Sequence, residues 1–425
     1  MYLIRYLHDV GIPYLNAEVS VSTGDSDHVI PNQHGKYVSS SWEVSGDLYY
    51  RLGSFVLFNL GGIAYEGDAT PTGSMLSMGI DYAQLDIGYR DHWLSPFTDS
   101  SMLVSTEAPT MPSITLSNYR PISRLGISYQ IFLADMSESS RIAYKGRYTK
   151  GNPRLAGVHL QAEPLTGYSF SFNRQFQFGG GERPNDSLGD LIDAFVDYSE
   201  HDTIESPFDR DREFGNQEAS LTSRIIFPGK RPFSVYFEYA GEDSSHFGTY
   251  RLGCVSFSMG LDMPLLWDVF DLSYETTEWQ NGWYVHHIYQ DGVTNKGLVV
   301  GHWFGDQRRF NDDAGGGSHM LRLGWQLQSG DYMRASYRTL KNGSYTTVDY
   351  ERMHELALGY SHQWNGQIIS LELASGRDVS GEFYTRLSAS MDFMQDWMTV
   401  SAGSCYTEDE KNDVTDLFVD MGMSY

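Results

Sequence analysis

Two kinds of residue alternate along Tyr168–Phe178, and this pattern limits the possible folds more than any other feature. Five of its six even positions carry Tyr or Phe, whereas the odd positions from Ser169 to Gln177 carry only Ser, Asn or Gln. A period of two is that of a β-strand with one apolar and one polar face. The same alternation returns at 125–133, 233–239 and 383–393. It predicts many strands that share one apolar environment.

The sequence contains no continuous apolar run of about 20 residues, which is the length that a membrane-spanning helix requires. Its 425 residues include 43 Gly and 29 Tyr, a usage typical of the turns and aromatic girdles of membrane barrels. A transmembrane strand takes about 9 to 11 residues, so the chain has room for roughly 16 to 20 strands. We therefore predict an all-β fold, a transmembrane antiparallel up-and-down β-barrel of a bacterial outer membrane.

The C-terminal residues favour this barrel over a large soluble sandwich or propeller, which would also show alternation. Leu417, Val419, Met421, Met423 and the terminal Tyr425 share one face of a last strand. This pattern resembles the C-terminal aromatic signal of outer-membrane barrels. We expect this segment to be the closing strand.

Two short helices are expected beside the strands. Apolar residues at helical spacing predict one over Tyr2–Ile12, and a possible capping box at Ser187–Asp190 with the stripe that follows predicts a loop helix reaching Phe195. We expect residues 1–35 to form a short N-terminal helical, periplasmic segment and residues 36–425 to form the barrel. The first seven residues are too short and too quickly polar for a signal peptide, so we expect a trimmed or incomplete start.

The formal net charge of −25 argues against nucleic acid as a partner, because phosphate binding needs clustered Lys and Arg. Cys254 and Cys405 are the only two cysteines. They form no disulfide framework and no zinc motif, and the sequence leaves open whether they pair.

No metal, cofactor or catalytic residue is predicted. His286 and His287 are followed by Asp291, His302 and Asp306, but neighbours on a strand point to opposite faces and do not easily share an ion. The chain has no Gly-x-Ser-x-Gly elbow, and the glycines at 179–181 lack the Lys and Ser or Thr of a phosphate loop. We predict that the protein is not an enzyme.

One segment instead combines aromatic rings with hydrogen-bonding groups. Flat rings beside carboxylates suit the apolar face and hydroxyl rim of a sugar, although Trp and Tyr also form the interfacial girdle of barrels. The predicted polysaccharide-binding residues are Trp279, Trp283, Tyr284, His286, His287, Tyr289, Asp291 and Trp303, with His302 nearby.

Several segments, read in order, resemble a known family. They are Tyr89–Pro96, Ala108–Leu116 with Arg120 and Pro121, Phe178–Arg183, Gly241–Asp243, and Val285–Gly292 followed by Gly297 and Gly301. These segments, and their order along the chain, are similar to those of the capsule-assembly proteins of the Wzi family.

The resemblance implies an outer-membrane barrel of about 18 strands and a lumen that is not an open pore. We expect a monomer set among outer-membrane lipid and lipopolysaccharide. It implies a surface lectin that helps attach capsular or exopolysaccharide to the cell. An outer-membrane porin or saccharide channel is the first alternative, because the acidic excess would also suit a cation-preferring channel. An outer-membrane hydrolase is the second alternative.

Overall fold

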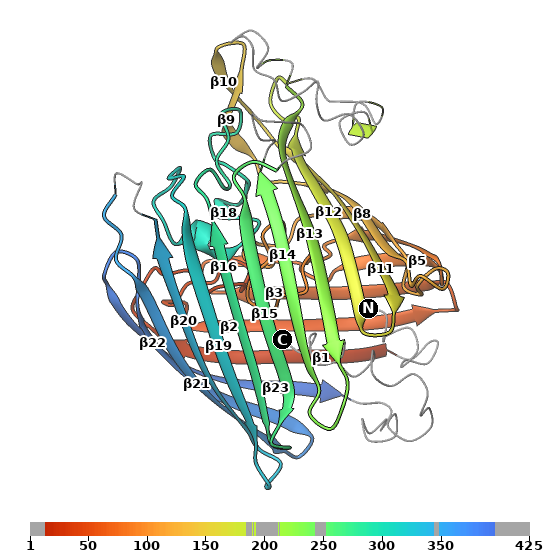
Figure 1. Cartoon of the computed structure of the whole chain (residues 1–425), viewed down its shortest axis with the longest axis vertical. Helices are drawn as coiled ribbons and strands as arrows, with labels where there is room; N and C mark the ends of the chain where they lie inside the picture. The colour runs from red at the N-terminus through yellow and green to blue at the C-terminus, as the bar shows by residue number, and fades with distance from the viewer. Residues whose placement is uncertain are drawn as a thin grey trace.

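An antiparallel sheet closes on itself to form a barrel in the computed structural model of the chain (Figure 1). The structure describes residues 13–183, 189, 191–192, 211, 213–242, 252–343 and 348–395. The sheet has 19 strands, and 18 of them form the wall, because β4 pairs only with β3. The predicted all-β barrel of about 18 strands is confirmed.

The wall strands are β1 (Pro13–Thr23), β2 (Trp42–Leu52), β3 (Val56–Tyr65), β5 (Met75–Ile80), β6 (Ala83–Gly88), β7 (Ser113–Ser117), β8 (Ser128–Asp135), β11 (Arg154–Leu165), β12 (Tyr168–Phe178), β13 (Gly215–Phe227), β14 (Phe233–Glu242), β15 (Ser256–Leu266), β16 (Phe270–Trp279), β19 (Gly316–Gln326), β20 (Tyr332–Asn342), β21 (Met353–Trp364), β22 (Gln367–Arg377) and β23 (Phe383–Gln395). The smaller elements are β4 (Asp68–Thr70), the hairpin of β9 (Ser139–Tyr144) and β10 (Arg147–Gly151), the pair β17 (Thr294–Asn295) and β18 (Leu298–Val299), and the 3-10 helix η2 (Trp303–Asp306).

The barrel closes through β1, which pairs with β2 on one side and with β23 on the other. In the second ladder Leu15 lies opposite Gln395 and Thr23 lies opposite Leu387. The predicted boundary at residue 35 is therefore wrong, because β1 is a wall strand that supplies both of these ladders. The predicted closing strand at 417–425 lies outside the described residues, and β23 has the pairing that was expected of it.

The apolar face of the alternating pattern points away from the barrel. On β12, Phe170 and Phe172 are exposed, whereas Ser171 and Asn173 between them are buried against the lumen. Other wall strands repeat this arrangement, as at Leu356 and Leu358 of β21. A continuous apolar outer surface of this kind is unfavourable in water. Membrane barrels present such an apolar band to lipid.

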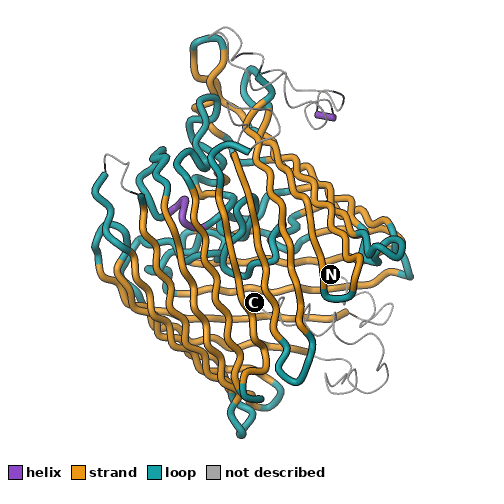
Figure 2. Tube along the Cα trace, in the orientation of Figure 1, coloured by secondary structure: helices purple, strands orange, loops and turns teal. Residues whose placement is uncertain are grey.

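The two rims of the barrel differ in the length of their connections (Figure 2). One rim has tight turns, such as Asn365-Gly366 between β21 and β22, where both residues have positive φ as the two-residue hairpin turn demands. The other rim carries the long connections, including residues 24–41, 89–112 and 280–315, and β9 and β10 rise above it in Figure 1. In membrane barrels the long loops are extracellular, so this rim faces outward.

The predicted helices are not confirmed. Tyr2–Ile12 lies outside the described residues. Of the loop helix from Ser187 to Phe195 the structure describes only Gly189, Leu191 and Ile192, which are helical. Among the residues that the structure covers, no helix is long and apolar enough to cross a membrane. Pairing between the two cysteines stays open, because Cys405 falls outside the described part of the chain.

Candidate functional site

Two long loops fold back into the barrel and fill its lumen. We call residues 89–112, between β6 and β7, and residues 280–315, between β16 and β19, the plug. They pack together through a buried apolar core that includes Leu94, Leu103, Trp283, Trp303 and Phe304. The 3-10 turn of η2 is part of this core and is drawn inside the strands in Figure 1. The plug therefore occupies the part of the lumen in which this core lies.

Polar side chains of the wall hold the plug. Asn173 and Gln175 of β12 donate to the backbone oxygens of Leu94 and Leu103, both at 2.9 Å. Glu275 of β16 accepts hydrogen bonds from the backbone amides of the plug residues 98 and 99, both at 2.8 Å. Because buried backbone groups are costly when unpaired, these contacts make the plug compatible with a dry lumen.

A charged cluster adds to this docking. Arg338 of β20 lies between Asp99 of the plug and Glu355 of β21, with nitrogen–oxygen distances of 2.6 Å to each. Its guanidinium also lies 5.3 Å from the ring centre of Trp303. All of these side chains are nearly buried, so the arginine compensates two carboxylates that would otherwise be unpaired in the protein interior.

Four of the predicted sugar-binding residues belong to the plug core and the wall beside it. Trp283 and Trp303 have no exposed area, and Trp279 and Tyr284 are at most 5% exposed. Trp279 stacks on Phe304 with ring centres 3.7 Å apart. Plug packing and wall contacts already cover these four rings, so their burial does not favour the predicted contact with a surface polysaccharide.

Tyr289 and Asp291 lie instead at a cavity of about 290 Å³ near the outer rim. Its lining comes from the start of the β9 hairpin, from β12 and from the plug. The lining residues are Ser137, Glu138, Ser139, Pro153, Gln177, Tyr289, Asp291, Gly292, Thr294, Lys296, Gly297 and Phe310. The volume is at the small end of ligand pockets, which suits a short stretch of a saccharide rather than a bulky group.

The charges around this cavity are held in defined positions. Ser139 donates to Asp291 at 2.5 Å, and Arg141 lies 3.6 Å from the other oxygen of that carboxylate. Lys296 forms an ion pair of 2.7 Å with Asp68. These pairs are partly exposed, so each can exchange a partner for a ligand hydroxyl at little cost.

Phe310 completes the cavity with an aromatic surface that is 55% exposed. The Arg141 guanidinium carbon lies 5.5 Å from its ring centre. An exposed ring beside fixed carboxylates and an ammonium group can stack on the apolar face of a sugar and bond to its rim. Sequence analysis missed Phe310, Glu138 and Lys296, because which loop residues stay exposed is decided only by how the loops pack.

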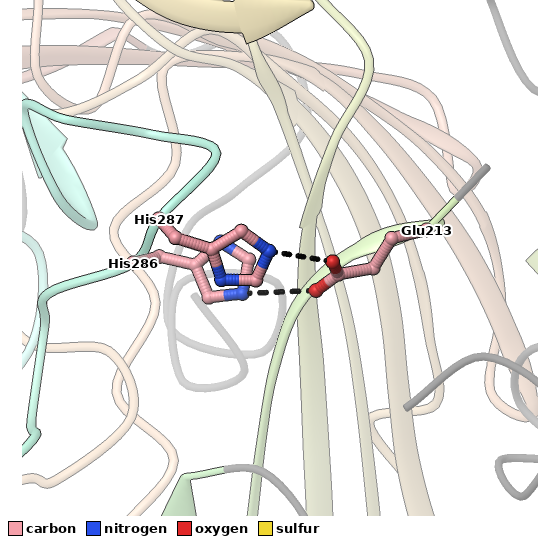
Figure 3. Close-up of side chains that lie close together, drawn as sticks. All are labelled: Glu213, His286 and His287. Atoms are coloured by element: carbon pink, nitrogen blue, oxygen red, sulfur yellow. Dashed lines mark hydrogen bonds and ion pairs between the residues drawn. The ribbon is translucent and has the colours of Figure 1, made fainter. Parts of the chain in front are cut away.

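His286 and His287 lie in the plug rather than on a strand, and both reach Glu213 (Figure 3). The Nε2 atoms of His286 and His287 are 3.3 Å and 2.6 Å from the two carboxylate oxygens. Burial raises the pKa of Glu213, but the hydrogen bonds from both histidines outweigh it and hold the pKa at about 2. The argument that these neighbours point apart is wrong, because strand alternation does not apply to an irregular loop.

His302 does not join this group. It lies in the plug core beside Trp303, and burial lowers the pKa of its imidazole to about 3, so it is neutral. The sequence-predicted residues thus separate into a buried core, a cavity wall and a histidine pair.

Comparison with known proteins gives a family match. The profile of the family described as "Capsule assembly protein Wzi" matches residues 25–404. A search of curated proteins finds no match. Among solved structures, Wzi of Escherichia coli, described as a carbohydrate-binding β-barrel of the outer membrane involved in group 1 capsule assembly, has a TM-score of 0.68 at 14% identity, covering 90% of this chain and 84% of that one.

Two outer-membrane proteins of Pseudomonas aeruginosa are also similar. OccK3 (OpdO) has a TM-score of 0.55 at 11% identity, covering 91% of this chain and 96% of that one. OprD has a TM-score of 0.52 at 12% identity, covering 91% and 94%. At such low identity these likenesses concern the fold alone.

Proposed function

Because the chain belongs to the capsule assembly protein Wzi family and is an outer-membrane β-barrel, we propose that it is a non-enzymatic lectin of the cell surface. It binds capsular or exopolysaccharide and helps attach the polymer to the cell. It acts as a monomer whose apolar band contacts lipid and lipopolysaccharide.

One observation carries this proposal: the plug fills the lumen, while a cavity with an exposed ring and fixed charges opens among the outer loops. A porin or saccharide channel needs a continuous wet lumen, which the packed plug opposes. A hydrolase needs a nucleophile oriented by a base, and no histidine lines this cavity among the described residues. Binding at the loops is the function that this arrangement favours.

We propose Asp291 and Phe310 as saccharide-contacting residues, and Tyr289, which is only 2% exposed, as a buried support behind them. Phe310 supplies the stacking surface and Asp291 accepts from sugar hydroxyls. The hydroxyl of Tyr289 already donates to the backbone oxygen of Gly179 at 3.1 Å, so its ring serves as a wall. His287 is 31% exposed but does not line this cavity.

The experiment measures cell-attached polysaccharide in strains that carry Phe310→Ala or Asp291→Asn. Both variants are expected to reduce retention severalfold, because an aromatic stacking contact and a hydrogen bond to a carboxylate are each worth about 1 kcal/mol. Phe383→Ala is the matched control: this ring is 79% exposed on the same rim, and Arg377 lies 5.5 Å from its centre, as Arg141 does from Phe310. Normal retention in both cavity variants, with normal barrel assembly, would remove this cavity from the function.

A further inference from the structure

Three side chains from two distant segments converge beside the cavity. Glu213 stands just before β13, and His286 and His287 are in the plug, 73 and 74 residues further along. One oxygen or nitrogen atom of each can be chosen so that all lie within 4.8 Å of one another. In Figure 3 the two imidazoles approach the two oxygens of one carboxylate from the same side.

The environment of this cluster is unusual for an acidic residue at a protein surface. The side chains of Glu213 and His286 are 8% and 3% exposed, whereas that of His287 is 31% exposed. A buried carboxylate with two imidazole nitrogens is a mixed oxygen and nitrogen donor set, and one side of it is open to solvent. Such sets bind zinc and similar transition metals, with water or a ligand in the open position.

We propose that Glu213, His286 and His287 form a binding site for one divalent transition metal ion of the zinc class. The ion takes the two Nε2 atoms and the carboxylate as ligands and is reached from the solvent side of His287. Small side-chain rotations bring the three donor atoms to equal distances from the ion. This site does not depend on the saccharide-binding role proposed above.

Metal binding replaces hydrogen bonds that the cluster makes in the ion-free protein. There, the Nε2–H group of each imidazole donates to the carboxylate; with the ion bound, Nε2 gives up its proton and becomes the ligand, and the ring proton resides on Nδ1. For His286 this change ends a contact of 3.3 Å in which Nδ1 accepts from the backbone amide of Ile288. That hydrogen bond is long, so little is lost for a coordinate bond.

The bound ion would join the plug to the base of β13. Tyr289 of the cavity wall lies close to this junction, since its ring centre is 6.1 Å from that of His286. The ion would therefore stiffen the segment that carries both Tyr289 and Asp291. It acts as a structural clamp between two outer loops.

The test uses the full chain in detergent, freed of metal with EDTA and titrated calorimetrically with zinc chloride. We expect one zinc ion per chain by elemental analysis. Glu213→Gln and His286→Gln are each expected to weaken zinc binding at least tenfold, because even partners outside the ligand set often contribute about tenfold. His362→Gln is the control: this histidine pairs with Asp331 at 2.6 Å on the opposite rim, and its loss should leave zinc binding unchanged.

Three outcomes would overturn the proposal. They are the absence of stoichiometric zinc uptake, equal uptake by the wild type and Glu213→Gln, and displacement of zinc by an equal concentration of calcium. Calcium prefers oxygen ligands, so such displacement would mean general binding to the acidic surface. If the variants fail to fold, the visible spectrum of cobalt added to the wild-type chain tests the proposal instead. A spectrum of nitrogen-ligated cobalt that is lost when equimolar zinc is added supports the site, and a spectrum of hydrated cobalt refutes it.

Discussion

Replacing Arg338 with methionine tests how the plug is held in the lumen. Methionine retains most of the volume of the side chain and lets it still pack near Trp303, but it removes the charge. Asp99 of the plug and Glu355 of the wall would then lose their 2.6 Å partners. Each keeps one other hydrogen bond, to the Trp303 indole and the Tyr384 hydroxyl respectively. Neither of these neutral donors compensates a buried charge.

The expected magnitude follows from this burial. Removing one partner of a buried ion pair typically costs about 3 to 5 kcal/mol. Undocking of the plug exposes Asp99 to water, so the loss of the ion pair destabilises the docked state and not the undocked state. At about 1.4 kcal/mol per tenfold change, the population with an undocked plug should rise roughly a hundredfold to several thousandfold.

Single-channel recording in planar bilayers measures this population. The wild-type barrel should conduct rarely, and Arg338→Met should show frequent openings of a wide pore. Arg334→Met is the matched control, since Arg334 lies four residues before Arg338 on the same face of β20 and pairs with Glu372 of the wall at 2.8 Å. Equal opening frequencies in the wild type and Arg338→Met would refute the docking role of the cluster. Large steady currents through the wild type would refute the packed lumen itself.

Two further predictions concern packing and pH. A Cβ at Gly260 would lie 2.0 Å from the buried ring of Tyr236, so Gly260→Ala should lower the free energy of unfolding in urea by about 1 to 3 kcal/mol. Gly359→Ala is the control and should leave it unchanged, because no atom lies nearer than 3.8 Å to a Cβ at that position. An unchanged urea midpoint for Gly260→Ala would contradict the close packing. In the plug, burial raises the pKa of Asp306 to about 7 beside Glu107, so the docked plug binds a proton that the undocked plug releases. Docking of the plug should therefore weaken as pH rises from about 4 to about 7. The measurement is amide hydrogen exchange across η2, which should become faster over this range after correction for intrinsic rates. Replacing both carboxyl groups of this pair, in the double variant Asp306→Asn/Glu107→Gln, should reduce that dependence, and an unchanged pH dependence in the double variant would assign it elsewhere.

Much of the wall could be predicted from the sequence because strands of a membrane barrel obey a local rule. At Phe170 and Phe172 the side chains must face lipid, and the residue between them must face inward, so a period of two suffices to assign both faces. Near the outer rim the rule fails: Phe176 and Phe178 continue the alternation, yet they are buried against Phe214. This neighbour lies 38 and 36 residues further along the chain, and no local pattern reports such a contact.

The candidate site was predicted only in part. Tyr289 and Asp291 line the cavity, but Trp283 and Trp303 are at the centre of the plug. Aromatic rings beside polar groups are equally suited to a sugar and to a packed core, and the sequence pattern cannot distinguish the two. Phe310 was missed because it is a single ring among charged residues, and its importance comes from its exposure beside Arg141.

By itself the sequence determined a β-barrel, its strand faces and its family resemblance, because alternation and motif order depend on residues that are close along the chain. Only the tertiary structure decided that two long loops return into the barrel and cover part of its inner face. Asn173 and Gln175 would suit a water-filled pore equally well, but they donate to the plug. Only folding also brought Glu213 to His286 and His287. Such contacts depend on how long loops return to the wall, and the energy that selects their path is spread over many distant residues.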